Sequence, residues 1–133
     1  MSAGTISNVF DSLRATAGCE AVGAASVESF IAAAGPAILF LTGDTLLRAE
    51  ATDVAVVVRE LMRSPAGRGI RLGIVDRRDE PTVMQKFGVV VVPALVLLQG
   101  GAVQEIIARI RDWPVYAQAF SRLRAAAPMA ATA

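Results

Sequence analysis

The chain has 133 residues, a length that suits one domain with a buried core. Its 13 basic and 12 acidic residues nearly cancel, which argues against nucleic acid as a partner, because phosphate binding needs a concentrated basic face. Histidine is absent, so Ser-His and Cys-His nucleophile pairs and His-containing zinc sites are excluded. The single cysteine, Cys19, excludes an internal disulfide. We expect no cofactor and no bound metal.

The cellular location is predicted from the termini and the apolar runs. Mean hydropathy is high at +0.53, but no apolar run approaches the roughly 18–20 residues that span a bilayer. Residues 1–6 have no basic segment followed by an apolar core, so no secretory signal is predicted. A lone cysteine is typical of a reducing compartment. We therefore expect a cytoplasmic protein without membrane insertion.

Helices and strands alternate in the first part of the chain. Apolar side chains at helical spacing predict a helix over residues 6–17, and residues 19–22 fit a short edge strand. Residues 26–34 are predicted as a short helix with Ser26 as its cap. Residues 37–42 are apolar on both faces, as expected of a central strand that helices cover on both sides.

The middle of the chain predicts two further helices around a core strand. Residues 53–62 form the first of these helices, with Thr52 or Asp53 near its cap. Residues 70–76 predict the strand, and Asp79 opens a helix that ends at Gly88.

A hairpin and a last helix complete the predicted domain. Residues 93–98 form a third core strand, and Gly100-Gly101 turns the chain into a strand over residues 102–110. The last helix begins at Asp112. We predict one domain over residues 1–124, followed by a disordered Ala-rich tail over residues 125–133.

This order of elements predicts an α/β fold, a three-layer α/β/α sandwich with a mixed central sheet, which is the thioredoxin architecture. Active thioredoxins carry Cys-x-x-Cys in the loop after the first core strand. The corresponding loop here, residues 43–50, contains no cysteine. If Phe40 aligns with the strand phenylalanine of those enzymes, Leu39 replaces their buried carboxylate. We therefore expect the fold without its redox chemistry.

The segment Phe87-Gly-Val-Val-Val-Val-Pro93 adds a local marker: a helix end, a glycine, β-branched residues and a proline before a strand. In thioredoxin-like proteins this proline is cis and faces the active-site loop. The resemblance implies a cis peptide bond before Pro93, and an ordinary proline at the start of a strand is the alternative.

Motifs in a fixed order resemble the hydrogenase accessory proteins of the HyaE/HupG/HoxO type: Phe-Leu-Thr-Gly-Asp44, Arg48-x-Glu50-x-x-Asp53, Phe87-Gly-Val89, Pro93-Ala-Leu-Val-Leu97 and Ile110-Arg-Asp-Trp113. The resemblance covers roughly residues 22–123. It implies a non-catalytic protein that matures the small, iron–sulfur subunit of [NiFe] hydrogenases and binds that precursor with its twin-arginine signal peptide before export. Whether a second accessory protein joins it stays open. Val90-Val-Val92 departs from the family pattern, which has a basic residue and an aromatic before the proline.

The candidate binding site is the loop after the first core strand. Asp44, Glu50, Asp53 and Glu60 make the segment over residues 44–60 acidic despite Arg48 and Arg59, and carboxylates bind guanidinium groups in bidentate geometry. An acidic loop therefore suits a twin-arginine signal. Capping of the helix by Asp53, and the favourable placement of Glu50 at a helix N-terminus, explain the same acids without a partner.

Val92, Pro93 and Trp113 complete the candidate partner-binding residues. Val92 and Pro93 are expected to line an apolar groove beside the loop. For Trp113, core packing of the ring with Asp112 as helix cap is the favoured interpretation, and a place on a partner surface is the alternative.

Other functions stay open at this point. Cys19 could serve thiol–disulfide exchange as a single-cysteine redox partner, although a small buried hydrophobe is the favoured interpretation. A scaffold domain for an unrelated protein is a third reading. Asp76, Asp79 and Glu80 lie close in sequence as a cation site requires, but a strand end followed by a helix cap explains them more simply.

Overall fold

The computed structural model describes residues 3–16, 19–43 and 49–126. Its helices and strands, in chain order, are α1 (Ala3–Arg14), β1 (Cys19–Val22), α2 (Val27–Ala32), β2 (Ala37–Leu41), α3 (Ala49–Arg63), β3 (Arg71–Val75), α4 (Glu80–Phe87), β4 (Ala94–Gln99), β5 (Ala102–Ala108) and α5 (Trp113–Ala125), with short 3-10 helices η1 (Pro65–Gly67) and η2 (Arg77–Asp79).

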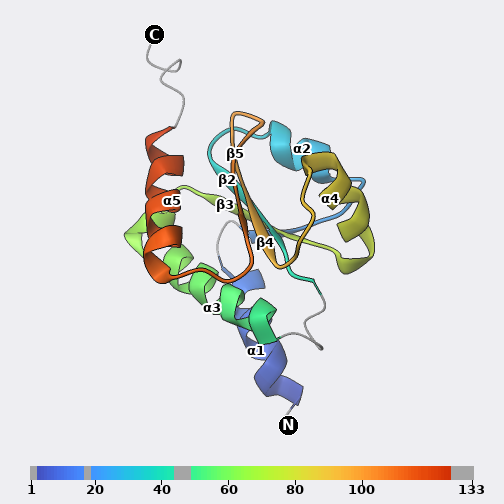
Figure 1. Cartoon of the computed structure of the whole chain (residues 1–133), viewed down its shortest axis with the longest axis vertical. Coiled ribbons are helices and arrows are strands. Elements are labelled where there is room, and N and C mark those ends of the chain that lie inside the picture. Colours follow the sequence, from blue (N-terminus) through green and yellow to red (C-terminus); the bar gives the residue numbers. More distant parts are fainter. Residues whose placement is uncertain (1–2, 17–18, 44–48, 127–133) are drawn as a thin grey trace.

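The strands form one mixed sheet in the order β1-β3-β2-β4-β5. β3 pairs in parallel with β1 and with β2, whereas β4 is antiparallel to both β2 and β5. Helices α1, α3 and α5 cover one face of this sheet, and α2 and α4 cover the other (Figure 1). The predicted three-layer sandwich with a mixed sheet is confirmed.

β2 lies at the centre of the molecule because its side chains supply both hydrophobic layers. All five of its residues are buried. Successive strand side chains point to opposite faces. Ile38 and Phe40 accordingly pack with α1, α3 and α5, and Leu39 and Leu41 pack with α2 and α4. The strand therefore ends at a fixed point between the layers, where the candidate loop begins.

The start of α3 differs from the prediction. The helix begins at Ala49, four residues before the expected cap at Asp53. Residues 49–51 are Ala-Glu-Ala, all strong helix formers, and they extend the helix towards the loop. Asp53 consequently lies in the second turn, where it is exposed and cannot cap the helix.

Three helices start where the sequence predicted, after Ser26, Asp79 and Asp112, but the predicted side-chain caps are absent. Each residue occupies the position before its helix, but none caps that helix through its side chain. The Ala24 amide instead donates to Asp79 Oδ2 at 2.9 Å, so this carboxylate connects the end of β1 to α4.

The predicted domain boundary falls one residue before the end of α5 at Ala125. Most of the predicted tail, residues 127–133, lies outside the described residues. Within the described ranges, no helix is long and apolar enough to cross a membrane.

Candidate functional site

Glu80 fixes the point where the chain leaves β2. Its side chain is only 4% exposed, and the Gly43 amide donates to Glu80 Oε2 at 2.9 Å. The Thr42 hydroxyl lies 3.5 Å from the same oxygen, and Arg77 Nε lies 3.4 Å from the other. Asp44 and Arg48, two of the predicted site residues, lie just beyond this point, outside the described residues. Glu80 therefore holds the start of the candidate loop.

The contact between Glu80 and the start of the loop was not predicted from the sequence, where Glu80 was considered only as part of a cation site that was not favoured. The part of the chain that the structure describes contains no group of three or more acids, cysteines or histidines arranged to hold a metal. Asp76 accepts from the Arg78 amide at 3.1 Å, and Asp79 accepts from Ala24. The sequence did contain a signal for the role of Glu80. The helix that begins at Glu80 follows a core strand, and the ends of neighbouring parallel strands lie at the same edge of a sheet. An acid at the start of that helix is therefore close to the end of the neighbouring strand.

The turn before β4 packs directly against the same glycine. Gly43 has φ +72°, and a Cβ atom at this position would lie 2.9 Å from Val92 Cγ2. Only glycine combines this backbone conformation with such a close approach. The Val92–Pro93 peptide bond is cis, as the resemblance implied. Pro93 is buried, whereas Val90, two residues before Val92, is 87% exposed. Val92 and Pro93 therefore do lie beside the loop.

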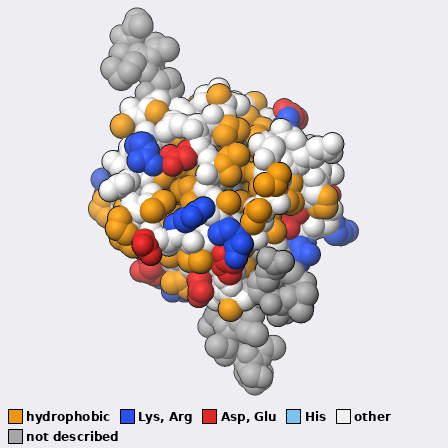
Figure 2. Space-filling view, viewed as in Figure 1, with side chains coloured by type: hydrophobic (Ala, Val, Ile, Leu, Met, Phe, Trp, Pro, Cys, Tyr) orange, Lys and Arg blue, Asp and Glu red, His pale blue; other side chains and the backbone are white. Residues whose placement is uncertain are grey.

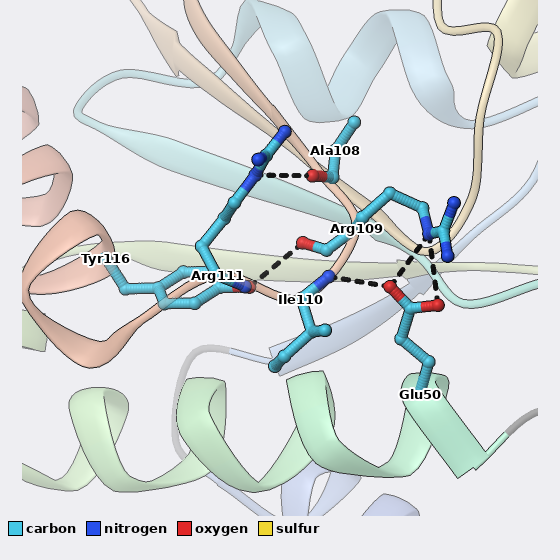
Figure 3. A network of polar contacts seen from close by, with 6 residues as sticks. All are labelled: Glu50, Ala108, Arg109, Ile110, Arg111 and Tyr116. Carbon is cyan, nitrogen blue, oxygen red and sulfur yellow. Dashed lines mark hydrogen bonds and ion pairs between the residues drawn. The ribbon is translucent and has the colours of Figure 1, made fainter.

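The Glu50 carboxylate is hydrogen-bonded to other residues of the same molecule. Its two carboxylate oxygens accept from Arg109 Nε at 3.0 and 2.8 Å, and one of them also accepts from the Ile110 amide at 2.8 Å (Figure 3). The hydrogen bond to Glu50 raises the pKa of Arg109 above its ordinary value. Glu50 thus connects the first turn of α3 to the end of β5 instead of presenting an open carboxylate.

Residues 109–112, which connect β5 to α5, are held from three sides. The Arg109 amide donates to the Pro93 carbonyl at 2.8 Å. The Tyr116 hydroxyl donates to the Arg109 carbonyl at 3.1 Å and accepts from the Arg111 amide at 2.9 Å. Arg109 has φ +67°, an uncommon conformation for a residue with a side chain. Glu50 and Pro93, predicted independently, therefore contact the same arginine, one through its side chain and the other through its backbone amide.

The favoured prediction that the Trp113 ring packs in the core is wrong, because Trp113 is 48% exposed. It is the first residue of α5, and side chains on a helix tilt towards its N-terminus. The ring therefore extends beyond the first turn and is covered incompletely. Tyr116, Phe120 and Leu123, the other residues of the predicted apolar face, are fully buried.

The structure offers no thiol at the loop. Leu39, on the strand that precedes the loop, is fully buried among apolar side chains. Cys19 lies on β1, separated from β2 by β3, and burial raises the pKa of its thiol above the ordinary value. Nucleophilic cysteines need a depressed pKa and access to solvent. Cys19 therefore has the character of a structural residue.

Comparison with known proteins places the chain in a family. A family model described as hydrogenase-1 expression protein HyaE matches residues 9–116. The chain belongs to the HyaE family. The matched range includes the loop, the cis proline, the 109–112 connection and Tyr116.

Relatives of the HyaE-family chain carry names of one kind. The hydrogenase expression/formation protein HupG of Bradyrhizobium diazoefficiens is 40% identical over 110 residues, covering 80% of this chain and 74% of that protein. HupG of Rhizobium leguminosarum bv. viciae is 41% identical, with 72% and 66% covered. The hydrogenase expression/formation protein HoxO of Cupriavidus necator is 36% identical, with 73% and 61% covered. The chain thus spans about three fifths to three quarters of the length of these relatives.

Solved structures confirm the fold alone. A mutant thioredoxin from Halobacterium salinarum superposes with a TM-score of 0.67 at 15% identity, covering 80% of this chain and 90% of that one. The thioredoxin of Malassezia sympodialis gives a TM-score of 0.67 at 12% identity, with 78% and 89% covered. The HyaE-family chain therefore has a thioredoxin-like fold.

Proposed function

We propose that this protein is a non-catalytic chaperone in the maturation of a [NiFe] hydrogenase, and that it holds the small-subunit precursor with its twin-arginine signal peptide before export. The observation that carries the proposal is its membership of the HyaE family, matched over residues 9–116. A thioredoxin-like fold whose loop over residues 43–50 lacks cysteine supports binding in place of catalysis.

The mechanism is control of a population. A protein that binds the immature precursor, and not the finished subunit, stabilises the immature state by mass action. Export then waits until cofactor loading and folding weaken this binding. No group in the chaperone needs to form or break a covalent bond.

The acids that could receive the signal are fewer than the sequence suggested. The Glu50 carboxylate already accepts three hydrogen bonds, so a guanidinium from a peptide would have to displace Arg109. Asp53 is exposed one turn further along α3. We assign the recognition of the signal arginines to Asp53, together with Asp44 outside the described residues. We assign the apolar part of the signal to the partly exposed Val92, beside the buried Pro93.

The test is binding of the protein to a peptide that carries a hydrogenase small-subunit twin-arginine signal. Changing both arginines of the peptide to lysine removes bidentate pairing, and we expect the dissociation constant to rise about tenfold. Asp53→Asn in the protein weakens binding to a similar degree. The matched control is Glu20→Gln, an exposed acid on β1 at the edge of the sheet furthest from β5, which leaves binding unchanged.

Isothermal titration calorimetry or fluorescence anisotropy measures both constants. Binding that ignores the lysine swap and Asp53→Asn moves recognition to the apolar surface or to the mature subunit. Failure to bind both the signal peptide and the full precursor contradicts the chaperone proposal.

A further inference from the structure

Apolar side chains are exposed together where β5 leads into α5. Ile106, Ile110, Trp113 and Val115 lie within ten consecutive residues, and each is between 37% and 48% exposed. Figure 2 shows basic side chains bordered by hydrophobic ones on the face where β5 ends. Single exposed apolar residues are ordinary, whereas a group of them with tryptophan and arginine has the composition of binding hot spots. We call residues 106–115 the β5–α5 corner.

The corner is rigid before any partner arrives. Glu50 holds Arg109 and the Ile110 amide, and the Tyr116 hydroxyl holds the backbone of Arg109 and Arg111 (Figure 3). The Arg109 amide is held by the Pro93 carbonyl. A preformed surface loses less conformational entropy on binding than a loose loop does. The positive φ of Arg109 is maintained by these contacts and sets the direction of its side chain.

Two guanidinium groups at the corner use only one of their three nitrogens internally. Arg109 bonds Glu50 through Nε, and Arg111 bonds the Ala108 carbonyl through Nε at 3.0 Å. Among the described residues, no partner exists for the Nη groups of either side chain, and both residues are exposed. Paired Nη groups bind carboxylates well because the guanidinium fork is planar.

Among the described residues, the acids near the corner leave the Nη groups of both arginines without a hydrogen-bond partner. Glu50 accepts from two donors, Arg109 Nε and the Ile110 amide. Asp112 is exposed beside Arg111, and Asp53 is exposed further along α3. The corner therefore presents the Nη groups of two arginines as hydrogen-bond donors, although Glu50 balances the charge of Arg109 and Asp112 lies beside Arg111.

We infer that the β5–α5 corner docks an apolar segment of a protein partner that carries carboxylate side chains. This inference rests on the proposed function for its partner, which is the mature part of the small subunit. The signal peptide is not the occupant that we assign, because its paired arginines offer no acceptor to the Nη groups of Arg109 and Arg111. The two ends of one precursor would then bind at separate places: the basic signal at the acidic loop and an acidic apolar segment at the corner.

The experiment compares three probes: the full precursor, the small subunit without its signal peptide, and the signal peptide alone. Arg111→Glu reverses one charge at the corner. The substitution keeps the backbone amide of residue 111, which donates to the Tyr116 hydroxyl. The matched control is Arg68→Glu, an exposed arginine that precedes β3 at the other end of the sheet and changes net charge equally. Trp113→Ala is a second corner variant, and circular dichroism with urea unfolding verifies that all variants fold.

Arg111→Glu is expected to weaken binding of the signal-free subunit at least about tenfold, and Arg68→Glu less than about threefold. Neither variant weakens binding of the signal peptide. If folded Arg111→Glu and Trp113→Ala proteins bind the signal-free subunit as tightly as the wild type, the corner inference is wrong while the chaperone proposal stands. Wild-type protein that binds only the signal peptide also overturns the corner inference. Wild-type protein that binds none of the probes overturns both.

Discussion

Glu80 shows how one side chain can set the course of a loop that lies far from it in sequence. Its carboxylate is buried between η2 and the end of β2, where it accepts the Gly43 amide. A buried carboxylate is costly unless its oxygens are hydrogen-bonded, and here Thr42, Gly43 and Arg77 supply the partners. Removing the acid would leave the Gly43 amide without an acceptor.

Glu80→Ala is therefore expected to lower the free energy of unfolding by about 1–3 kcal/mol, the cost of a buried donor left unpaired. Glu80→Gln should lose less, because the amide oxygen still accepts from Gly43. Urea unfolding followed by circular dichroism gives both values. Glu20→Ala, at an exposed acid, serves as the control and stays within about 0.5 kcal/mol of the wild type. Equal losses for Glu80→Ala and Glu20→Ala would show that the Gly43 contact contributes nothing.

At the level of elements, the connection from β5 to α5 joins parts of the fold that are distant in sequence. Arg109 is 59 residues from Glu50, and the two form the contact between β5 and the first turn of α3. Tyr116 holds the same connection from the first turns of α5. The hydroxyl must keep its proton to donate to the Arg109 carbonyl, and burial raises the pKa of Tyr116 above its ordinary value of 10.0.

The pH dependence follows in sign from this shift. The stabilising neutral form of Tyr116 is fully present in both states below pH 10. Above that pH the unfolded state releases its proton first, so the free energy of unfolding falls as pH rises through the folded pKa. Cys19, whose pKa is also raised, contributes in the same direction. We therefore predict that, in a Cys19→Ser background, stability falls above pH 10 and that Tyr116→Phe reduces this fall.

Urea unfolding between pH 7 and 11 measures this dependence. Tyr116→Phe should also cost about 1 kcal/mol at pH 7, because the hydroxyl bonds to the connection are lost. The same steepness above pH 10 with and without Tyr116 would contradict the assignment.

Considered whole, the molecule keeps the layers and strand order of a thioredoxin fold while its one thiol lies away from the candidate loop. β1, which carries Cys19, is an edge strand, and β3 separates it from β2. Among the described residues, Leu39 at the centre of β2 is surrounded by apolar side chains. The thioredoxin-like fold is therefore present here without a thiol on the strand that leads into the loop.

The protein is predicted not to accelerate the reduction of insulin disulfides by dithiothreitol, and Cys19→Ser should behave identically. Iodoacetamide should label Cys19 more slowly than it labels glutathione at pH 7.5, since burial keeps the thiol protonated. Turbidity and mass spectrometry provide the two readouts. Insulin reduction that disappears in Cys19→Ser would restore the thiol-exchange reading.

Strand positions were predictable because their signal is local. β2 and β4 are short apolar runs bounded by glycine or proline, and burial on both faces needs nothing else from the sequence. The start of α3 was predicted wrongly, since Asp53 resembles a cap, whereas the helix formers at residues 49–51 extend the helix before it.

The site itself depended on contacts between distant segments. Asp44, Glu50 and Asp53 were equivalent acids in the sequence, and only the fold distinguishes Glu50, which Arg109 engages, from the exposed Asp53. Glu80 and Gly43 are 37 residues apart, so no spacing rule joins them. The cis peptide bond before Pro93 was predicted correctly, and this prediction came from the resemblance.

The exposure of Trp113 has a spectroscopic consequence. The chain contains one tryptophan, the first residue of α5. Intrinsic fluorescence excited at wavelengths above about 295 nm therefore reports on this single position. Because the indole ring is half in water, a partner that covers the corner shifts the emission to shorter wavelength, whereas a ligand confined to the acidic loop leaves it unchanged. The protein therefore contains its own optical probe for which of its surfaces a precursor occupies.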